Sequence, residues 1–287
     1  MCQEVLFRDH IGPSQVRCSK QLCEAHGVGK VTNMNPQLFE ETFEHLPSSP
    51  IVESIIQWTA RASVAANDTT WHSRFAQLLP EFPKAQPLHW QSIETMIDSD
   101  GSSQQTVNRP WIGLRLESQD SRWIVQADWQ GVVLSRLCPY IGWTEFSTLG
   151  IKVWSSFLDC THPTEIQKLG VRSINQISIE SFGDVRYYLK HPPECLDDAE
   201  LPANGFMYQS LHRIPNQPYQ VNVLRTIPPK NLGAPVAPSL IVDIDAMTTE
   251  GHLDVGSSQE HFRALKWVKD KTFFNLMTEE AIEKFRK

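Results

Sequence analysis

Apolar side chains recur at every second position through several segments of the chain, which is the pattern of strands with one buried face. Over residues 52–64, Ile56 and Trp58 share one face, and Glu53 and Gln57 share the other. The same pattern predicts further strands at about 88–97, 111–118, 122–128, 132–138, 169–179, 205–213, 219–227 and 239–247.

Helical spacing of apolar residues, together with start and stop signals, predicts helices between these strands. The first is expected to begin at Asn35, a candidate N-cap followed by Pro36, and to end at about Leu46. Other helices are expected at about 70–78, 144–159, 183–190 and 258–276, with Thr278 capping a last short one.

The order of these elements predicts the fold class and the domains. Residues 1–34 show neither period, so we expect a poorly ordered N-terminal extension. The rest divides into residues 35–165 and 166–287, and each part contains a strand, a helix, several strands and a helix. We predict an α+β fold with antiparallel sheets and two similar halves in one compact unit. An internal duplication and a chance likeness of two amphipathic closing helices both remain open.

Composition narrows the function classes. Hydrophobic residues make up 40% and charged residues 21% of the 287 positions, which are globular values. The net charge of -7 and the lack of a dense Lys/Arg run disfavour a nucleic-acid partner. No apolar run reaches the ~18 residues of a transmembrane helix, and we see no signal peptide. The six scattered cysteines are typical of free thiols, so we expect a cytoplasmic protein.

Four short motifs stand in order along the chain before a C-terminal amphipathic helix. They are Pro50-Ile51-Val52-Glu53, Tyr140-Ile141-Gly142-Trp143, Gly170-Val171-Arg172-Ser173-Ile174-Asn175 and Asp243-Ile244-Asp245. Their order and spacing resemble a sporadically distributed family of uncharacterised bacterial proteins of similar length, in which position 173 is usually tyrosine. The resemblance implies a bacterial, cytoplasmic protein but no activity. The patchy distribution of that family suggests a part of a defence or toxin–antitoxin type system.

Asp243 and Asp245 are the sharpest chemical feature. They stand two apart on a predicted strand, so both carboxylates share one face while Val242 and Ile244 point to the core. Paired carboxylates can hold Mg²⁺ for phosphoryl or nucleotidyl transfer. A third carboxylate beside them would favour that reaction, but no glycine-rich phosphate cradle accompanies the pair.

Arg172, on another predicted strand, offers the two aspartates a different partner. A guanidinium fork can pair with one or both carboxylates, and we prefer this interpretation to a metal site. Asn175 stands three residues further on and therefore faces the opposite side of the strand. Arg172, Asp243 and Asp245 are the candidate ligand-binding residues, and we expect no catalytic residue, metal or cofactor.

The two closing helices each carry a second apolar spot besides the stripe that should face the sheet. The spots consist of Ile151 and Leu158 on the earlier helix and of Trp267 and Phe274 on the later one. One stripe suffices to pack a helix on a sheet. The second spots therefore predict an interaction surface, on which the helices pack on each other or on a partner.

Two N-terminal motifs fall short of known sites. Residues 27–30 lack the upstream glycine and the hydroxyl residue of a phosphate-binding loop. Cys18, Cys23 and His26 lack the fourth ligand and the usual spacing of a zinc site. We therefore interpret the cysteines as free thiols.

These observations favour a recognition protein that binds a protein or a small ligand, with a homodimer left open. The alternative is a metal-dependent phosphoryl- or nucleotidyl-transfer enzyme that uses Asp243 and Asp245. A third interpretation is a purely structural oligomer.

Overall fold

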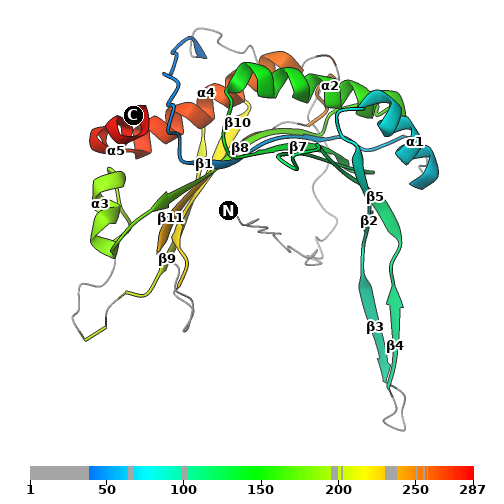
Figure 1. The fold of residues 1–287 in the computed structure, drawn as a ribbon, viewed down its shortest axis with the longest axis horizontal. Coiled ribbons are helices and arrows are strands. Elements are labelled where there is room, and N and C mark those ends of the chain that lie inside the picture. Colours follow the sequence, from blue (N-terminus) through cyan, green and yellow to red (C-terminus); the bar gives the residue numbers. More distant parts are fainter. Residues whose placement is uncertain are drawn as a thin grey trace, which may run out of the picture.

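The architecture is a curved antiparallel sheet with helices packed on one of its faces (Figure 1). The computed structural model describes residues 39–63, 68–97, 103–194, 200–201, 203–229, 238–249, 251–254, 256 and 258–287. The predicted extension of residues 1–34, with residues 27–30 and Cys18, Cys23 and His26, lies outside this described part. The fold is α+β, as predicted.

The nine strands of the main sheet follow the order β2-β5-β6-β7-β1-β8-β11-β10-β9, so β1 and β8 pair at the centre. Their bounds, in sheet order, are Lys84–His89, Trp111–Glu117, Trp123–Asp128, Gly131–Leu137, Ile51–Thr59, Lys168–Ser178, Ser239–Thr248, Tyr219–Ile227 and Phe206–Arg213. Every pair is antiparallel. The two predicted halves therefore share one continuous sheet.

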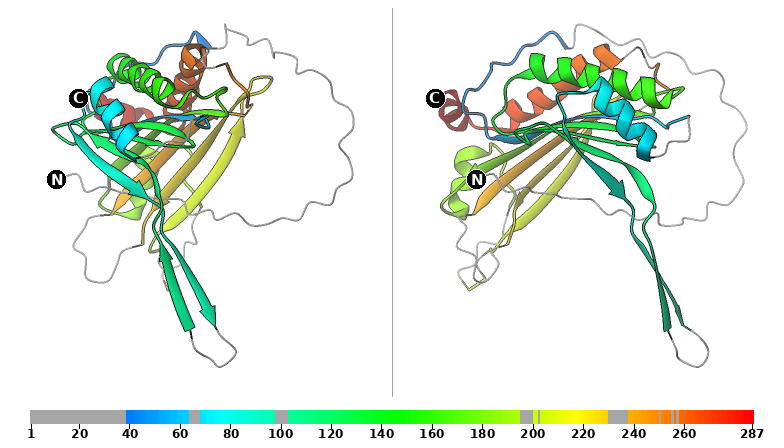
Figure 2. Two further views of the ribbon diagram at one scale, coloured as in Figure 1. Left: turned by 90° about the vertical axis from the view of Figure 1, so that its right-hand side faces the viewer. Right: turned by 45° about the vertical axis from the view of Figure 1, so that its right-hand side comes forward.

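The helices are α1 (Asp68–Leu78), α2 (Trp143–Thr161), α3 (Val185–Tyr188), α4 (Ser258–Leu276) and α5 (Glu279–Arg286). A short 3₁₀ turn, η2 (Phe182–Asp184), precedes α3. Figure 2 shows α1, α2 and α4 on the same side of the sheet, and none of these described helices lies on the opposite, concave face. Thr278 caps α5 by accepting a hydrogen bond from the Ala281 amide, as predicted. None of the described helices has the length and apolarity needed to cross a membrane.

Trp58 is the centre of the core between the sheet and the helices. It is 1% exposed and lies parallel to Trp154 of α2, with ring centroids 5.6 Å apart. Phe262 of α4 meets it edge-on at 4.8 Å. Gly150 lets α2 approach closely, since a Cβ there would lie 3.2 Å from Ile56. Burial of one such large side chain stabilises the fold by about 1.5–3 kcal/mol, so this cluster fixes both long helices on the sheet.

The predicted helix from Asn35 to Leu46 is wrong for its described part. After Phe39 the chain runs without helix to Leu46, along α4 and α5. Phe39 packs edge-on against Trp267 at 5.4 Å, and Phe43 stacks on Phe274 at 5.2 Å. These tertiary contacts outweigh the local preference for helix.

The same contacts correct the predicted interaction surface. Trp267 and Phe274 are covered by the chain's own segment, so they are not a free surface for a partner. Ile151 and Leu158 are partly buried against the core. Ile151 also lines a groove between α2 and α4, with Phe262 on the other side.

The predicted strand 88–97 is two strands, and a further strand was missed. Beyond β2, the chain forms β3 (Ser92–Ile97) and β4 (Ser103–Asn108), which pair as a separate hairpin. This hairpin projects from the body like an arm (Figure 1). All of β4 is exposed, so its sequence has no alternation between apolar and polar positions to reveal it.

Candidate functional site

The concave face of the sheet collects charged side chains from three central strands. Glu53 comes from β1, Arg172 from β8, and Asp243 and Asp245 from β11. Arg172 is the cross-strand partner of Asp245. Residues directly opposite each other share a face of the sheet, so these four side chains lie on the same open face.

Arg172 and Asp243 form a two-pronged ion pair. The Arg172 Nε donates to Asp243 Oδ1 at 2.8 Å, and Nη2 donates to Oδ2 at 2.5 Å. The side chains are 27% and 10% exposed. The predicted pairing of Arg172 with an aspartate is confirmed. Both oxygens of Asp243 accept from the guanidinium, so a metal ion at this carboxylate would compete with Arg172.

Glu53 is a third carboxylate on this face. It lies across β8 from Asp243, because both are cross-strand partners of Ile174. Burial raises the pKa of Glu53, although a hydrogen bond with Ser135 and the charge of Arg172 oppose this shift. The nearby charge of Asp243 raises the pKa further. The intervening strand thus places one guanidinium among several carboxylates.

The sequence also indicated Glu53, since it stands on the polar face of a half-buried strand, but it was not chosen as a site residue. Its importance comes from the β1–β8 register, which residue spacing along one strand does not reveal. Among the described residues, no group of three or more His, Cys, Asp or Glu side chains is arranged to hold a metal ion. The arrangement of these carboxylates, Glu53, Asp243 and Asp245, is therefore that of a charge network around Arg172 rather than of a metal centre.

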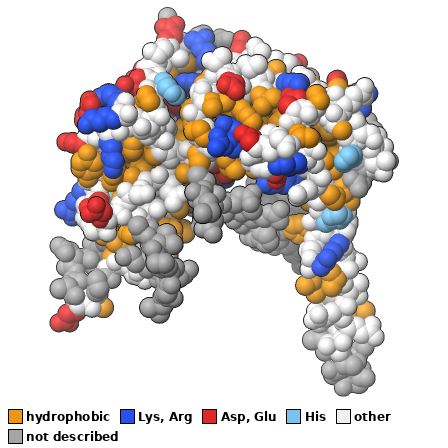
Figure 3. Space-filling view, in the orientation of Figure 1, with side chains coloured by type: hydrophobic (Ala, Val, Ile, Leu, Met, Phe, Trp, Pro, Cys, Tyr) orange, Lys and Arg blue, Asp and Glu red, His pale blue; other side chains and the backbone are white. Residues whose placement is uncertain are grey.

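Other polar side chains extend this face toward both edges of the sheet. Arg115 Nε donates to Glu117 on β5 at 2.9 Å, and Gln209 Nε2 donates to Asn222 at 2.9 Å. Arg172 and Arg115 on this face are thus each held by a carboxylate. Figure 3 likewise shows charges of both signs interspersed over the visible surface, without a continuous basic area.

Exposed apolar side chains frame the concave face. On the edge strand β9, Met207 is 72% and Leu211 is 59% exposed. Leu211 pairs with Asn222, which pairs with Asp245, so it lies in the row that also holds Arg172. On the other side, exposed apolar residues lie on and beside the β3–β4 arm: Trp90, Ile93, Met96 and Val107.

Asn175 lies on the other side of β8 from Arg172, as predicted. It is fully buried beneath the helices, and its Nδ2 donates to the Val242 carbonyl at 2.9 Å. The site residues chosen from the sequence therefore fall together on one face, and the last motif residue of β8 serves the opposite face.

Comparison of the chain with models of known protein families finds no match, and comparison with curated proteins finds none either. The resemblance drawn from the four motifs stays a prediction.

Proposed function

We propose that the chain is a recognition protein whose concave sheet face binds a protein partner. The observation that carries this proposal is the composition of that face. Charged and amide side chains lie among half-buried apolar ones such as Ile55 and Ile174 at its centre, and exposed apolar side chains stand at its two sides. The long helices of the described part cover the opposite face (Figure 2).

The chemistry of the face favours protein over nucleic acid. A phosphate backbone requires cations that are free to neutralise it, whereas Arg172 and Arg115 are held by Asp243 and Glu117. Amide side chains both donate and accept hydrogen bonds, as the peptide backbone does. Among the described residues, the amide side chains on this face include Gln57, Gln86, Gln126, Gln176, Gln209, Gln220 and Asn222.

The edge strand β9 gives the partner a defined place. Among the described strands, β9 pairs only with β10, so within this part of the chain its outer backbone edge is left for another strand. An extended segment of the partner would add to this edge through backbone hydrogen bonds. Met207 and Leu211, four residues apart on the concave face, would then supply the apolar contact.

The test is affinity capture of proteins from the native host. It uses variants that change the exposed apolar residues beside the concave face and leave the core unchanged. Met207→Glu and Leu211→Glu should each lose the captured partner, since a charge in the contact must be desolvated. Trp129→Glu is the matched control, because Trp129 is 54% exposed but lies in the turn between β6 and β7. Equal capture by all three variants would refute the proposal.

We also infer a bacterial, cytoplasmic setting, in which the protein serves a defence or toxin–antitoxin type system. The motif resemblance supports this inference, and so do the unbridged thiols of Cys138 and Cys160. An internal duplication belongs to the same proposal. In support of it, each half places its first strand at the sheet centre and its later strands outward in reverse order: β1, β7, β6, β5 and β8, β11, β10, β9.

A further inference from the structure

A cavity of about 150 Å³ lies on the helix side of the sheet, behind the charged face. It is bounded by α4, by β1 and β8, and by the segment that precedes β1. Residues of three motifs contribute to its wall: Ile51, Tyr140, Trp143, Ser173 and Asn175. A dry apolar cavity of this size accommodates a benzene ring, so the space is large enough for a small ring compound.

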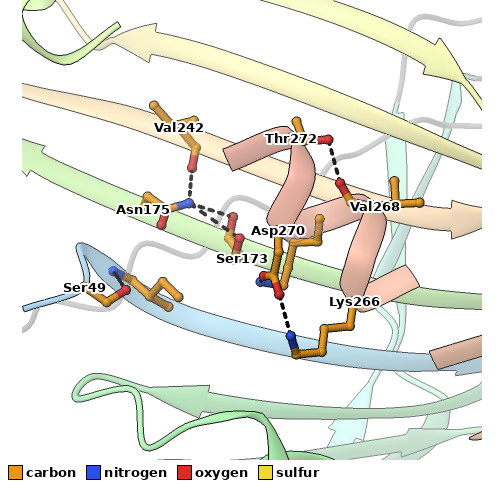
Figure 4. A network of polar contacts seen from close by, with 10 residues as sticks. Ser49, Ser173, Asn175, Val242, Lys266, Val268, Asp270 and Thr272 are labelled. Atoms are coloured by element: carbon orange, nitrogen blue, oxygen red, sulfur yellow. Dashed lines mark hydrogen bonds and ion pairs between the residues drawn. The ribbon is translucent and has the colours of Figure 1, made fainter. Parts of the chain in front are cut away.

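The wall contains an unsatisfied acceptor. Asn175 is 0% exposed, and its Oδ1 has no hydrogen-bond partner, whereas its Nδ2 is bonded to Val242. In Figure 4 the nitrogen faces Val242, and the oxygen lies on the side away from it. Buried polar groups in proteins are nearly always paired, so this oxygen still needs a donor.

The wall also carries an excess positive charge. Lys266 Nζ lies 2.6 Å from Asp270 Oδ2 (Figure 4). Lys269 pairs with the other oxygen of the same carboxylate. Burial alone would raise the pKa of Asp270, but the two ammonium groups outweigh burial and lower it. Asp270 is therefore ionised at neutral pH, and one carboxylate faces two ammonium groups.

The other acidic group of the wall does not compensate that charge. Glu44 is held by Arg286, with Oε1 and Nη2 2.6 Å apart. Lys269 is only 8% exposed, so solvent screens its ammonium weakly. The cavity thus favours an anion next to Lys266 and Lys269.

Aromatic side chains make up much of the remaining wall. Phe273 and Phe274 come from α4, and Tyr140 and Trp143 from the segment around the start of α2. Burial, and then the charge of Asp270, raises the pKa of Tyr140, so its hydroxyl stays protonated and able to donate. Ser173 also lines the space, so an aromatic ring placed at that position would occupy it.

We propose that this cavity binds a small aromatic carboxylate that carries a second hydrogen-bond donor. The ring packs among Tyr140, Trp143 and Phe273, and the carboxylate pairs with Lys266 and Lys269. The donor meets Asn175 Oδ1. This site lies on the opposite side of the sheet from the proposed protein-binding face and does not depend on it.

Calorimetric titration of the full chain with three probes tests the proposal. 4-Hydroxybenzoate carries the ring, the anion and the donor, and should bind with a Kd of about 1 mM or tighter. 4-Hydroxybenzamide replaces the carboxylate with a neutral amide and should bind at least ~10-fold more weakly. Benzoate lacks the hydroxyl donor and should bind several-fold more weakly, because Asn175 Oδ1 then stays unpaired.

Substitutions in the cavity wall test whether the probes bind there. Lys266→Met should abolish the preference for acid over amide. Lys271→Met is the matched control on the same helix, since Lys271 pairs with Glu41 and does not line the cavity, and it should keep the preference. Ser173→Tyr should fill the space and remove binding of all three probes. If this variant fails to fold, the comparison of Lys266→Met with Lys271→Met decides.

Three results would overturn the proposal. One is the absence of binding tighter than about 1 mM for 4-hydroxybenzoate. A second is equal affinity for 4-hydroxybenzoate and 4-hydroxybenzamide. The third is an equal loss of preference in Lys266→Met and Lys271→Met, which would place the binding elsewhere. Unchanged partner capture by Lys266→Met would show separately that the concave face is intact.

Discussion

Arg172→Met should destabilise the fold more than the loss of an ordinary surface ion pair does. The substitution keeps most of the aliphatic stem and removes the guanidinium. It leaves Asp243, 8% exposed, without its partner, and it removes a positive charge close to Glu53. A buried charge without a partner is the costly outcome of breaking such a pair.

The magnitude follows from the geometry of the pair. Two unit charges about 4 Å apart interact by about 4 kcal/mol at an effective dielectric constant near 20. Breaking a fully buried pair from one side costs about 3–5 kcal/mol. Because the Arg172 side chain is 27% exposed, we expect the lower end of this range, about 3 kcal/mol.

Urea denaturation of Arg172→Met, Asp243→Asn and the double variant would measure this cost. We expect the free energy of unfolding to fall by about 3 kcal/mol in Arg172→Met, by about 2 kcal/mol in Asp243→Asn and by about 3 kcal/mol in the double variant. The coupling energy between the two residues is then about 2 kcal/mol. The cost of Arg172→Met should shrink in acid, where protonation removes the stranded charges. Arg286→Met breaks an exposed pair with Glu44 and should cost much less.

Additivity of the two single costs to within about 0.5 kcal/mol would refute this reasoning, because independent sites behave in that way. A cost for Arg172→Met that does not change between neutral and acidic pH would also contradict it. Either result would mean that the network on the concave face is no stronger than a surface contact.

Three further predictions follow from neighbouring features. Burial raises the pKa of Glu53, so its ionisation costs stability as pH rises from the unfolded pKa through the folded one. Glu53→Gln should therefore melt higher than the wild type at pH 7 and equally at about pH 3. Phe43→Ala should lower the free energy of unfolding, measured in urea, by about 1–2 kcal/mol, because it uncovers Phe274. Elution of the variant as the same species as the wild type would show that the segment covering Phe274 belongs to the same chain. Titration with Mg²⁺ or Mn²⁺, with and without a nucleotide, should show no stoichiometric binding at Asp243, since Arg172 already pairs with that carboxylate. Stoichiometric binding that Asp243→Asn abolishes would restore the enzyme interpretation.

The elements predicted best from the sequence are those in which the spacing of apolar residues matches the buried face. The strand 219–227 and the helix 258–276 have the predicted bounds, because each strand alternates and each helix carries a stripe. The shared face of Asp243 and Asp245 follows from the same period of two. The pair with Arg172 could be proposed because a guanidinium is the best local partner for two carboxylates.

The failures occurred where tertiary contacts decide the conformation. Residues 39–46 have a helix-like spacing, but Phe39 and Phe43 contact α4 and hold the segment out of a helix. The strand β4 has no buried face, so only its hairpin partner β3 defines it. The cavity was not predicted because Tyr140 and Asn175 come from different elements, and no spacing within one element brings them together.

A short motif on a strand need not describe one site. In Gly170–Asn175, the period of two sends Arg172 and Ile174 to the concave face, and Ser173 and Asn175 to the helix side. The same run of residues therefore serves an ion-pair network and a cavity wall, with the sheet backbone between them. Substitutions along this one strand should separate into two classes: changes at Arg172 alter stability and its pH dependence, and changes at Ser173 alter ligand binding.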